Sequence, residues 1–149
     1  MVVEWSGSDT GRIMAPARAE WCDSLRLLEI RVVHGDSGLA VAVYPVTTPR
    51  PDSYPVRPPE DADSAPPASA VALRWFAETA IKGFQSDSGL VVLERADGRV
   101  SGHVTAAMRS VNDGMRLDLR GVFRDVRIVP ATRGCVTRPA AQPPDTGVD

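Results

Sequence analysis

Apolar and polar residues alternate along much of the chain with the two-residue period of a half-buried β-strand. In residues 25–33, leucine, isoleucine and valine alternate with charged residues, and a second apolar run follows at 39–44. Residues 35–38 between them read Gly-Asp-Ser-Gly, a turn sequence, so the two runs predict a β-hairpin. In residues 2–22 the apolar residues fall mainly on alternate positions, as in a strand with one buried face. Glycines and Pro16 interrupt this pattern, which predicts an edge position in a sheet.

The second half of the chain is the most regular part of this pattern. Alternating runs follow one another from Gly89 to Val129, separated by the turn sequences Asp97-Gly98 and Asn112-Asp113-Gly114. An Asp-Gly pair favours a type I′ turn, in which both central residues have positive φ. Short strands joined by tight turns predict a meander of antiparallel strands.

Two segments depart from simple alternation. Residues 45–68 hold most of the 13 prolines and few apolar residues, and proline lacks the N–H group that a strand ladder needs. We expect a long surface loop there, with one short edge strand at 53–56. Residues 69–85 fit helical spacing as well as strand spacing. Because the flanking segments are predicted to be β, we predict that residues 69–85 form two strands.

Short strands with turn signals between them predict an all-β fold, either an antiparallel β-sandwich or a small β-barrel with a long proline-rich loop. The length of 149 residues suits a single domain, which we expect to span residues 1–135. Residues 136–149 carry prolines and little apolar content, and this composition predicts a disordered tail.

Charge narrows the classes of partner. The formal net charge is −2, so the chain as a whole does not attract a polyanion, and no nucleic-acid partner is expected. Lys82 is the only lysine, and the arginines are scattered along the sequence. We interpret them as a consequence of composition, because a binding patch needs clustering. No apolar run approaches the roughly 20 residues of a transmembrane helix, so no transmembrane segment is expected.

Cys22 and Cys135 lie near the two ends of the expected domain. Neither has metal-ligand or C-x-x-C spacing, which leaves a disulfide or two buried free thiols. The disulfide is the prediction, because closing a loop of about 110 residues stabilises a domain by up to about 4.7 kcal/mol. The first residues show no signal peptide, so the chain is either cytosolic or a mature exported form. A disulfide favours export, to the periplasm or the cell surface.

The Gly-Asp-Ser-Gly sequence at 35–38 is similar to the nucleophile segment of chymotrypsin-like serine proteases. In those enzymes a histidine and an aspartate precede the serine on separate barrels. Here only His34 precedes Ser37, and it is too close in sequence to act as a separate base. A second histidine, His103, reaches Ser37 only if the fold brings the two together. We therefore interpret the segment as a turn in which Gly35 and Gly38 adopt backbone angles closed to other residues.

Other candidate chemistry is sparse. His34 and His103 lack a metal-ligand spacing, and Asp97 and Asp113 lack the rest of a calcium loop, so no metal is expected. The tryptophans, including Trp21 and Trp75, are expected mainly in the core, and Tyr54 in the proline-rich segment is the aromatic expected to be exposed. No catalytic residue and no cofactor site are predicted.

The C-terminal half has a recurring pattern. Ser88-Gly89 opens an apolar strand, Ser101-Gly102 opens an alternating strand, and the last strand carries Gly121-Val122-Phe123. Over about residues 88–128 this pattern resembles the C-terminal half of small exported bacterial proteins of unknown function, many of them lipoproteins. Val104 stands where those proteins often carry an aromatic residue, and their lipid-bearing cysteine is absent. The resemblance implies an antiparallel β fold and a location in the cell envelope, and it points to no particular activity, because none is established for those proteins.

The sequence leaves three hypotheses for function. The first is a non-enzymatic exported β module of the bacterial envelope that binds a protein or cell-surface component, or that serves a structural role. The second is a small-ligand carrier with an apolar cavity inside a barrel. The third and weakest is a hydrolase, which requires titratable groups that converge in a cleft.

Overall fold

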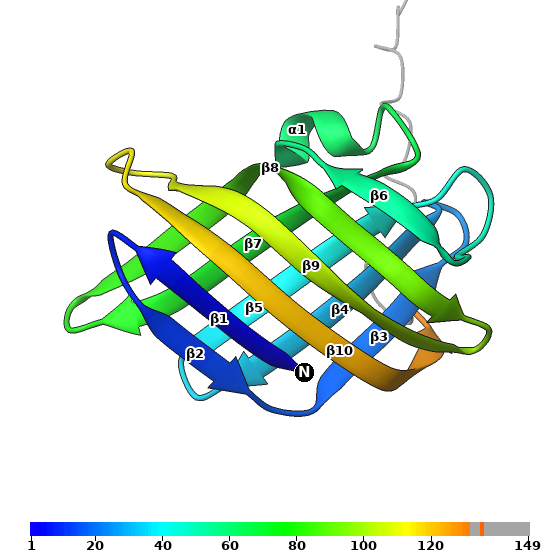
Figure 1. Ribbon diagram of the computed structural model, residues 1–149, viewed down its shortest axis with the longest axis horizontal. Coiled ribbons are helices and arrows are strands. Elements are labelled where there is room, and N and C mark those ends of the chain that lie inside the picture. Colours follow the sequence, from blue (N-terminus) through cyan, green and yellow to red (C-terminus); the bar gives the residue numbers. More distant parts are fainter. Residues whose placement is uncertain (132–134, 136–149) are drawn as a thin grey trace, which may run out of the picture.

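The computed structural model describes residues 1–131 and Cys135, so the tail expected at 136–149 lies outside the described residues. The elements are β1 (Val2–Gly7), β2 (Gly11–Met14), β3 (Ala17–Cys22), β4 (Leu27–His34), β5 (Ser37–Tyr44), β6 (Asp52–Val56), α1 (Pro59–Ala62), β7 (Ala68–Ala77), β8 (Ala80–Ala96), β9 (Arg99–Ser110) and β10 (Arg116–Pro130). The prediction of an all-β fold is confirmed, with one helical turn as the exception (Figure 1).

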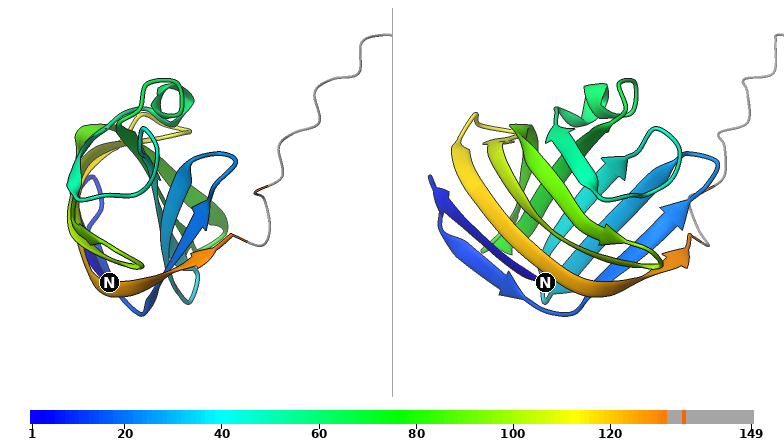
Figure 2. Two further views of the ribbon diagram at one scale, coloured as in Figure 1. Left: turned by 90° about the vertical axis from the view of Figure 1, so that its right-hand side faces the viewer. Right: turned by 45° about the vertical axis from the view of Figure 1, so that its right-hand side comes forward.

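Seven of the strands close a ring of hydrogen-bonded neighbours in the order β3, β4, β5, β7, β8, β9, β10 and back to β3. Six of the junctions are antiparallel. The seventh, between β10 and β3, is parallel and spans only three residue pairs, from Ile128 opposite Ala19 to Pro130 opposite Trp21. We call this junction the seam. The ring gives the molecule a barrel-like shape, seen from one end in the left view of Figure 2.

The remaining strands widen the wall of the ring. β9 follows one side of β10 along most of its length, whereas the other side of β10 pairs first with β1 and then, at the seam, with β3. β2 pairs with β1. In Figure 1, β1, β2, β6, β9, β10 and the later part of β8 form the near wall, and β3, β4, β5, β7 and the beginning of β8, which pairs with β7, lie behind it. We call the solvent-facing side of this near wall the outer wall.

The interior is filled by the apolar residues that the alternation predicts. In β4, for example, Leu28, Ile30 and Val32 point inward and are buried, while the charged residues between them face solvent. The inward side chains of the other strands join them in one hydrophobic cluster. Because burying one such side chain contributes about 1.5–3 kcal/mol, this cluster is the main source of the stability of the ring.

The proline-rich segment contains the short strand predicted at 53–56. β6 pairs with β8 along its length and touches β7 through the single pair Val56 and Ser69. The buried Ser69 hydroxyl donates a hydrogen bond of 2.9 Å to the Tyr54 carbonyl, and the Arg57 N–H donates one of 2.8 Å to the Ser69 carbonyl. These bonds hold the segment to β7 where a regular ladder does not form.

Residues 69–85 form two strands, as predicted, which are the β7–β8 hairpin. The prediction of a type I′ turn at Asp97-Gly98 is wrong, because only Gly98 has a positive φ there, of 94°. The reason lies in the loop length. Ala96 pairs with Val100, so three residues form the loop, and a three-residue hairpin loop needs only one residue in the left-handed region.

Candidate binding site on the outer wall

The protease-like segment forms the predicted turn. His34 and Ser37 are the last residue pair of the β4–β5 hairpin. Gly35 has a φ of 56°, as expected, but Gly38 lies outside the left-handed region, so that part of the prediction is wrong. His103 lies on β9, which is separated from β4 by β10 and β3 around the ring. The two histidines therefore belong to different walls of the molecule.

The titratable residues singled out in the sequence make local contacts. The Nδ1 atom of His103 lies 3.4 Å from a carboxylate oxygen of Glu94, and both side chains are largely exposed. A hydrogen bond from Arg95 lowers the pKa of Asp97. The pKa of Asp113 is also lowered, chiefly by its hydrogen bond with Ser110. Within residues 1–131 and Cys135, no group of three histidine, cysteine or acidic side chains is placed to hold a metal ion.

The expectation that Tyr54 is exposed is wrong. Its side chain is 1% exposed, and its hydroxyl donates a hydrogen bond of 2.8 Å to the Arg50 carbonyl. The inward face of β6 explains this, because Tyr54 and Val56 are its two buried residues and complete the core. Trp75 is half-buried and stacks on Trp5, with ring centroids 5.4 Å apart.

Cys22 and Cys135 form the predicted disulfide. Cys22 is the last residue of β3, so the bond lies beside the seam. The Ser24 hydroxyl donates a hydrogen bond of 2.9 Å to the Cys135 carbonyl. Both contacts hold Cys135 close to the end of β3.

A trough of about 1020 Å³ crosses the outer wall at right angles to the strands. The strand register places the residues of each side of the trough directly opposite one another. One side is formed by the outward side chains of Arg12, Glu4, Arg120 and Thr105. The other side is formed by Thr10, Ser6, Asp118, Ala107 and Ser88.

The floor of the trough is the row of residues between its two sides. This row runs through Gly11, Trp5, Leu119, Ala106 and Gly89, which are successive neighbours on β2, β1, β10, β9 and β8. Trp5, Leu119 and Ala106 are buried and point into the ring, so the floor is largely their backbone. Five strands span about 19 Å, since neighbouring strands lie about 4.8 Å apart.

Charges of both signs face the trough. Glu4 and Arg12 form an ion pair of 3.5 Å. Asp118 and Arg120 form no ion pair with any residue that the structure describes, and their charges are available to a ligand. The two acids balance the two arginines, so the trough is polar but close to neutral.

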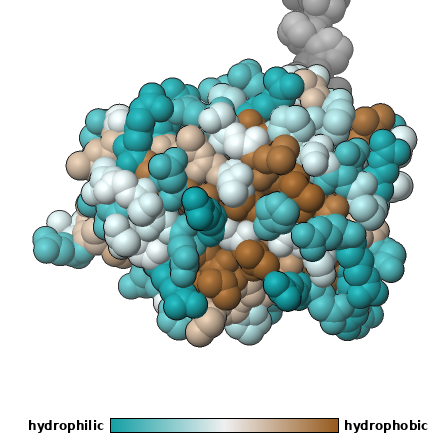
Figure 3. All heavy atoms as spheres, viewed as in Figure 1, coloured by the Kyte–Doolittle hydropathy of each residue, from teal (hydrophilic) through white to brown (hydrophobic). Residues whose placement is uncertain are grey.

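An apolar row runs beside the trough. Met14, Val2, Val122 and Val92 follow one another in register next to the side that holds Glu4, with His103 between the last two. Met14 is 65% exposed and Val122 43% exposed. Figure 3 shows this face, where apolar side chains gather among hydrophilic ones. The outer wall thus offers hydrogen-bonding groups, paired charges and apolar surface side by side.

Sequence patterns did not reveal the trough. Alternation marks Arg120 and Thr105 as outward residues, but only strand pairing makes them neighbours of Glu4.

The chain matches no protein-family model, no curated protein and no solved structure. Among the described residues, no helix is long and apolar enough to cross a membrane.

Proposed function

We propose that this chain is a non-enzymatic, exported binding module whose trough holds an extended polypeptide segment of a partner protein. The trough itself carries this proposal. Its length of about 19 Å accommodates about six residues of extended peptide at about 3.3 Å per residue. The hydroxyl groups of Ser6, Ser88 and Thr105 supply donors and acceptors for peptide groups, and the apolar row beside it suits apolar side chains.

Charge favours a peptide over a single small ion. Arg120 and Asp118 lie on one strand, two residues apart, and offer one group of each sign. A peptide segment that carries both a basic and an acidic side chain can pair with Asp118 and Arg120 at once.

Export, to the periplasm or surface of a bacterial cell, is part of the proposal. The Cys22–Cys135 disulfide supports it, because disulfides persist in oxidising compartments.

The alternatives fit the geometry less well. A carrier would hold its ligand inside the ring, where Phe123, Tyr54 and Leu93 are each 1% exposed or less and occupy the space. A hydrolase would need a converging nucleophile and base, whereas Ser37 lies in a hairpin turn and His103 on the opposite wall. A surface site needs neither an interior cavity nor a converging nucleophile and base.

The test is selection of peptides from a random heptapeptide library on the intact protein. We expect selected peptides to bind the wild type and to lose at least tenfold in affinity on Ala107→Arg, which fills the trough, or on Arg120→Glu, which reverses a charge in it. The matched control is Arg74→Glu on β7, which makes the same charge change on an exposed arginine outside the trough. Failure to select any binder, or equal losses in the control, would refute the proposal.

A further inference from the structure

A second hollow lies next to the seam, on the other part of β10. Its volume is about 480 Å³, and we call it the seam hollow. It lies between residues 16–20, which lead into and along β3, and residues 124–127 of β10, with Met1 and Val129 at its edges. It shares no residue with the trough, so a ligand of the seam hollow is independent of the proposed peptide site.

The seam hollow gathers arginines that are far apart in sequence. Arg18, Arg124 and Arg127 line it together with two acidic residues, Glu20 and Asp125. Each of the two acids is already engaged. Glu20 accepts a bond of 3.0 Å from Arg31, and Asp125 binds Arg95 at 3.3 Å and Arg99 at 3.0 Å. Among the described residues, these ion pairs leave the positive charge of the three arginines in the hollow without a compensating acid.

None of the three arginines that line the hollow forms an ion pair with a residue of the described part of the chain. Arg18 also lies directly opposite Arg31 on β4. On the other side of Arg18 lies β10, which runs parallel to β3 at the seam with Ile128 opposite Ala19. Arg127, one residue before Ile128, therefore lies next to Arg18, one residue before Ala19. Like charges directly opposite one another destabilise a sheet. Arg31 is compensated by Glu20 and Glu29, whereas Arg18 and Arg127 are neighbours with no acidic partner among the described residues. The repulsion between these two arginines is relieved when an anion binds between them.

A β-bulge places Arg124 and Arg127 on the same face. Residues three apart in a regular strand point to opposite faces. Between Phe123 and Val126, however, β10 has two residues where β9 has only Ser101, and this extra residue reverses the parity of the rest of the strand. Val126 then packs against the core, and Arg127 points outward as Arg124 does.

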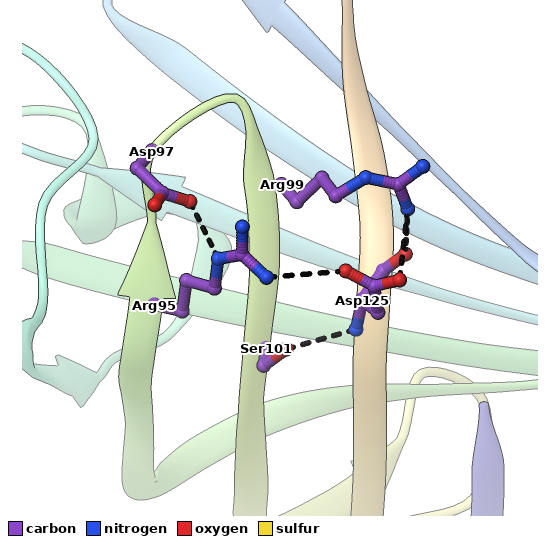
Figure 4. A network of polar contacts seen from close by, with 5 residues as sticks. All are labelled: Arg95, Asp97, Arg99, Ser101 and Asp125. Carbon is purple, nitrogen blue, oxygen red and sulfur yellow. Dashed lines mark hydrogen bonds and ion pairs between the residues drawn. The ribbon is translucent and has the colours of Figure 1, made fainter.

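The polar network in Figure 4 holds this bulge in place. Asp125 has a φ of 51°, in the left-handed region that non-glycine residues seldom occupy. Its N–H donates to the Ser101 hydroxyl at 2.8 Å, its carbonyl accepts from Arg99 at 2.7 Å, and Arg95 and Arg99 reach its carboxylate from β8 and β9 (Figure 4). Asp125 is therefore a positioning residue for the two arginines on either side of it.

We propose that the seam hollow binds phosphate, either as the free ion or as a phosphate ester. The planar guanidinium group donates paired hydrogen bonds that match phosphate oxygens, and three of them compensate a dianion. The hollow is larger than one phosphate group, which leaves room for the remainder of an ester. The ligand is found either in solution or in a lipid headgroup, and the two sources share the same chemistry.

The test compares two double variants with equal loss of charge. Arg18→Gln with Arg127→Gln removes two arginines of the hollow, and the control, Arg57→Gln with Arg74→Gln, removes two exposed arginines outside it. Calorimetric titration with inorganic phosphate and sedimentation with phosphatidylglycerol vesicles, against phosphatidylcholine vesicles, identify the source. We expect at least a tenfold loss of affinity in the first variant, less than twofold in the control, and weaker binding at higher salt.

The outcomes are distinct. Binding of free phosphate that depends on Arg18 and Arg127 supports a soluble ligand, and binding only to phosphatidylglycerol vesicles with the same dependence supports a headgroup. Arg124→Gln is a second variant, expected to weaken the same binding, for use if the double variant does not fold. Absence of both kinds of binding in the wild type, or an equal loss in the control, would overturn the proposal.

Discussion

The Cα atoms of Cys22 and Cys135 lie 5.4 Å apart, beside the parallel junction that closes the ring. The ladder of the seam is only three residue pairs long, whereas the neighbouring β9–β10 ladder is much longer. One backbone hydrogen bond, from Ala131 N–H to the Trp21 carbonyl at 2.9 Å, continues the seam toward the disulfide. The covalent bond thus reinforces the shortest junction of the ring.

We expect reduction of this disulfide to destabilise the protein by about 2–5 kcal/mol, because the bond closes a very long loop. Urea unfolding with and without reductant measures the difference, and the variant Cys22→Ser with Cys135→Ser gives the same value without reductant. Mass spectrometry of the native protein should find no free thiol. Ser24→Ala, which removes the hydrogen bond to the Cys135 carbonyl and the weaker contacts with the two sulfur atoms but leaves the covalent bond, is the control and should cost about 1 kcal/mol. Superimposable curves with and without reductant would contradict this role.

The turn at residues 35–38 makes a second prediction. Gly35→Val should cost about 1–2 kcal/mol, because a φ of 56° is unfavourable for a residue with a side chain. Gly38→Val should cost less, since Gly38 lies outside that region and a Cβ atom there meets its nearest neighbours at 3.7 Å. Ser37→Ala should cost at most about 1 kcal/mol. Thermal melts rank the three variants.

The same segment is tested chemically. A fluorophosphonate probe, which labels activated serines, should leave the protein unmodified. Stoichiometric labelling that Ser37→Ala abolishes would make the chain a hydrolase and contradict the proposed function.

Gly102 is predicted to be intolerant of any side chain. A Cβ atom there would overlap the Val92 carbonyl oxygen and meet the ring of Phe123 at 3.1 Å. We expect Gly102→Ala to destabilise the protein by about 1–3 kcal/mol through overpacking. Gly83→Ala is the matched control in a strand, because its Cβ atom would meet its nearest neighbour, Val111, at an ordinary 3.5 Å. Equal unfolding midpoints in urea for the two variants would show that the backbone moves to accommodate the methyl group.

Stability should fall at alkaline pH through Tyr54. Burial raises the pKa of this phenol above its ordinary value of 10.0. A raised pKa in the folded state contributes stability that is complete below the pKa of the unfolded chain and is lost as pH rises through the folded-state pKa. The free energy of unfolding should therefore decrease above about pH 10, by at most about 1.4 kcal/mol per pH unit for each tyrosine.

Urea unfolding between pH 8 and 12 measures this dependence. Tyr54→Phe should reduce the slope and lower stability near neutral pH by about 1 kcal/mol, since the hydrogen bond to Arg50 is lost. Part of the slope should remain, because burial also raises the pKa of Tyr44. An unchanged slope in Tyr54→Phe would contradict the assignment.

Local patterns in the sequence are sufficient to locate the strands and the turns, although not the type of the turn at Asp97-Gly98. Alternation in residues 25–33 and the turn at 35–38 predict the β4–β5 hairpin, and β context is enough to assign residues 69–85 to two strands. These features depend on neighbours in sequence: side-chain direction alternates along a strand, and glycine and aspartate favour turns wherever they occur. The exposure predicted for Tyr54 is wrong because its own segment is proline-rich, while its burial depends on pairing with β8.

The pairing of strands that are distant in sequence is visible only in the tertiary structure. The parallel seam between β10 and β3 joins residues more than a hundred positions apart, and no local period records such a partner. The bulge at Asp125 reverses the parity of β10, so alternation alone would place Arg124 and Arg127 on opposite faces. The sequence by itself therefore determined strands, turns and the two bridging cysteines, whereas long-range pairing decided that scattered arginines and trough residues become neighbours.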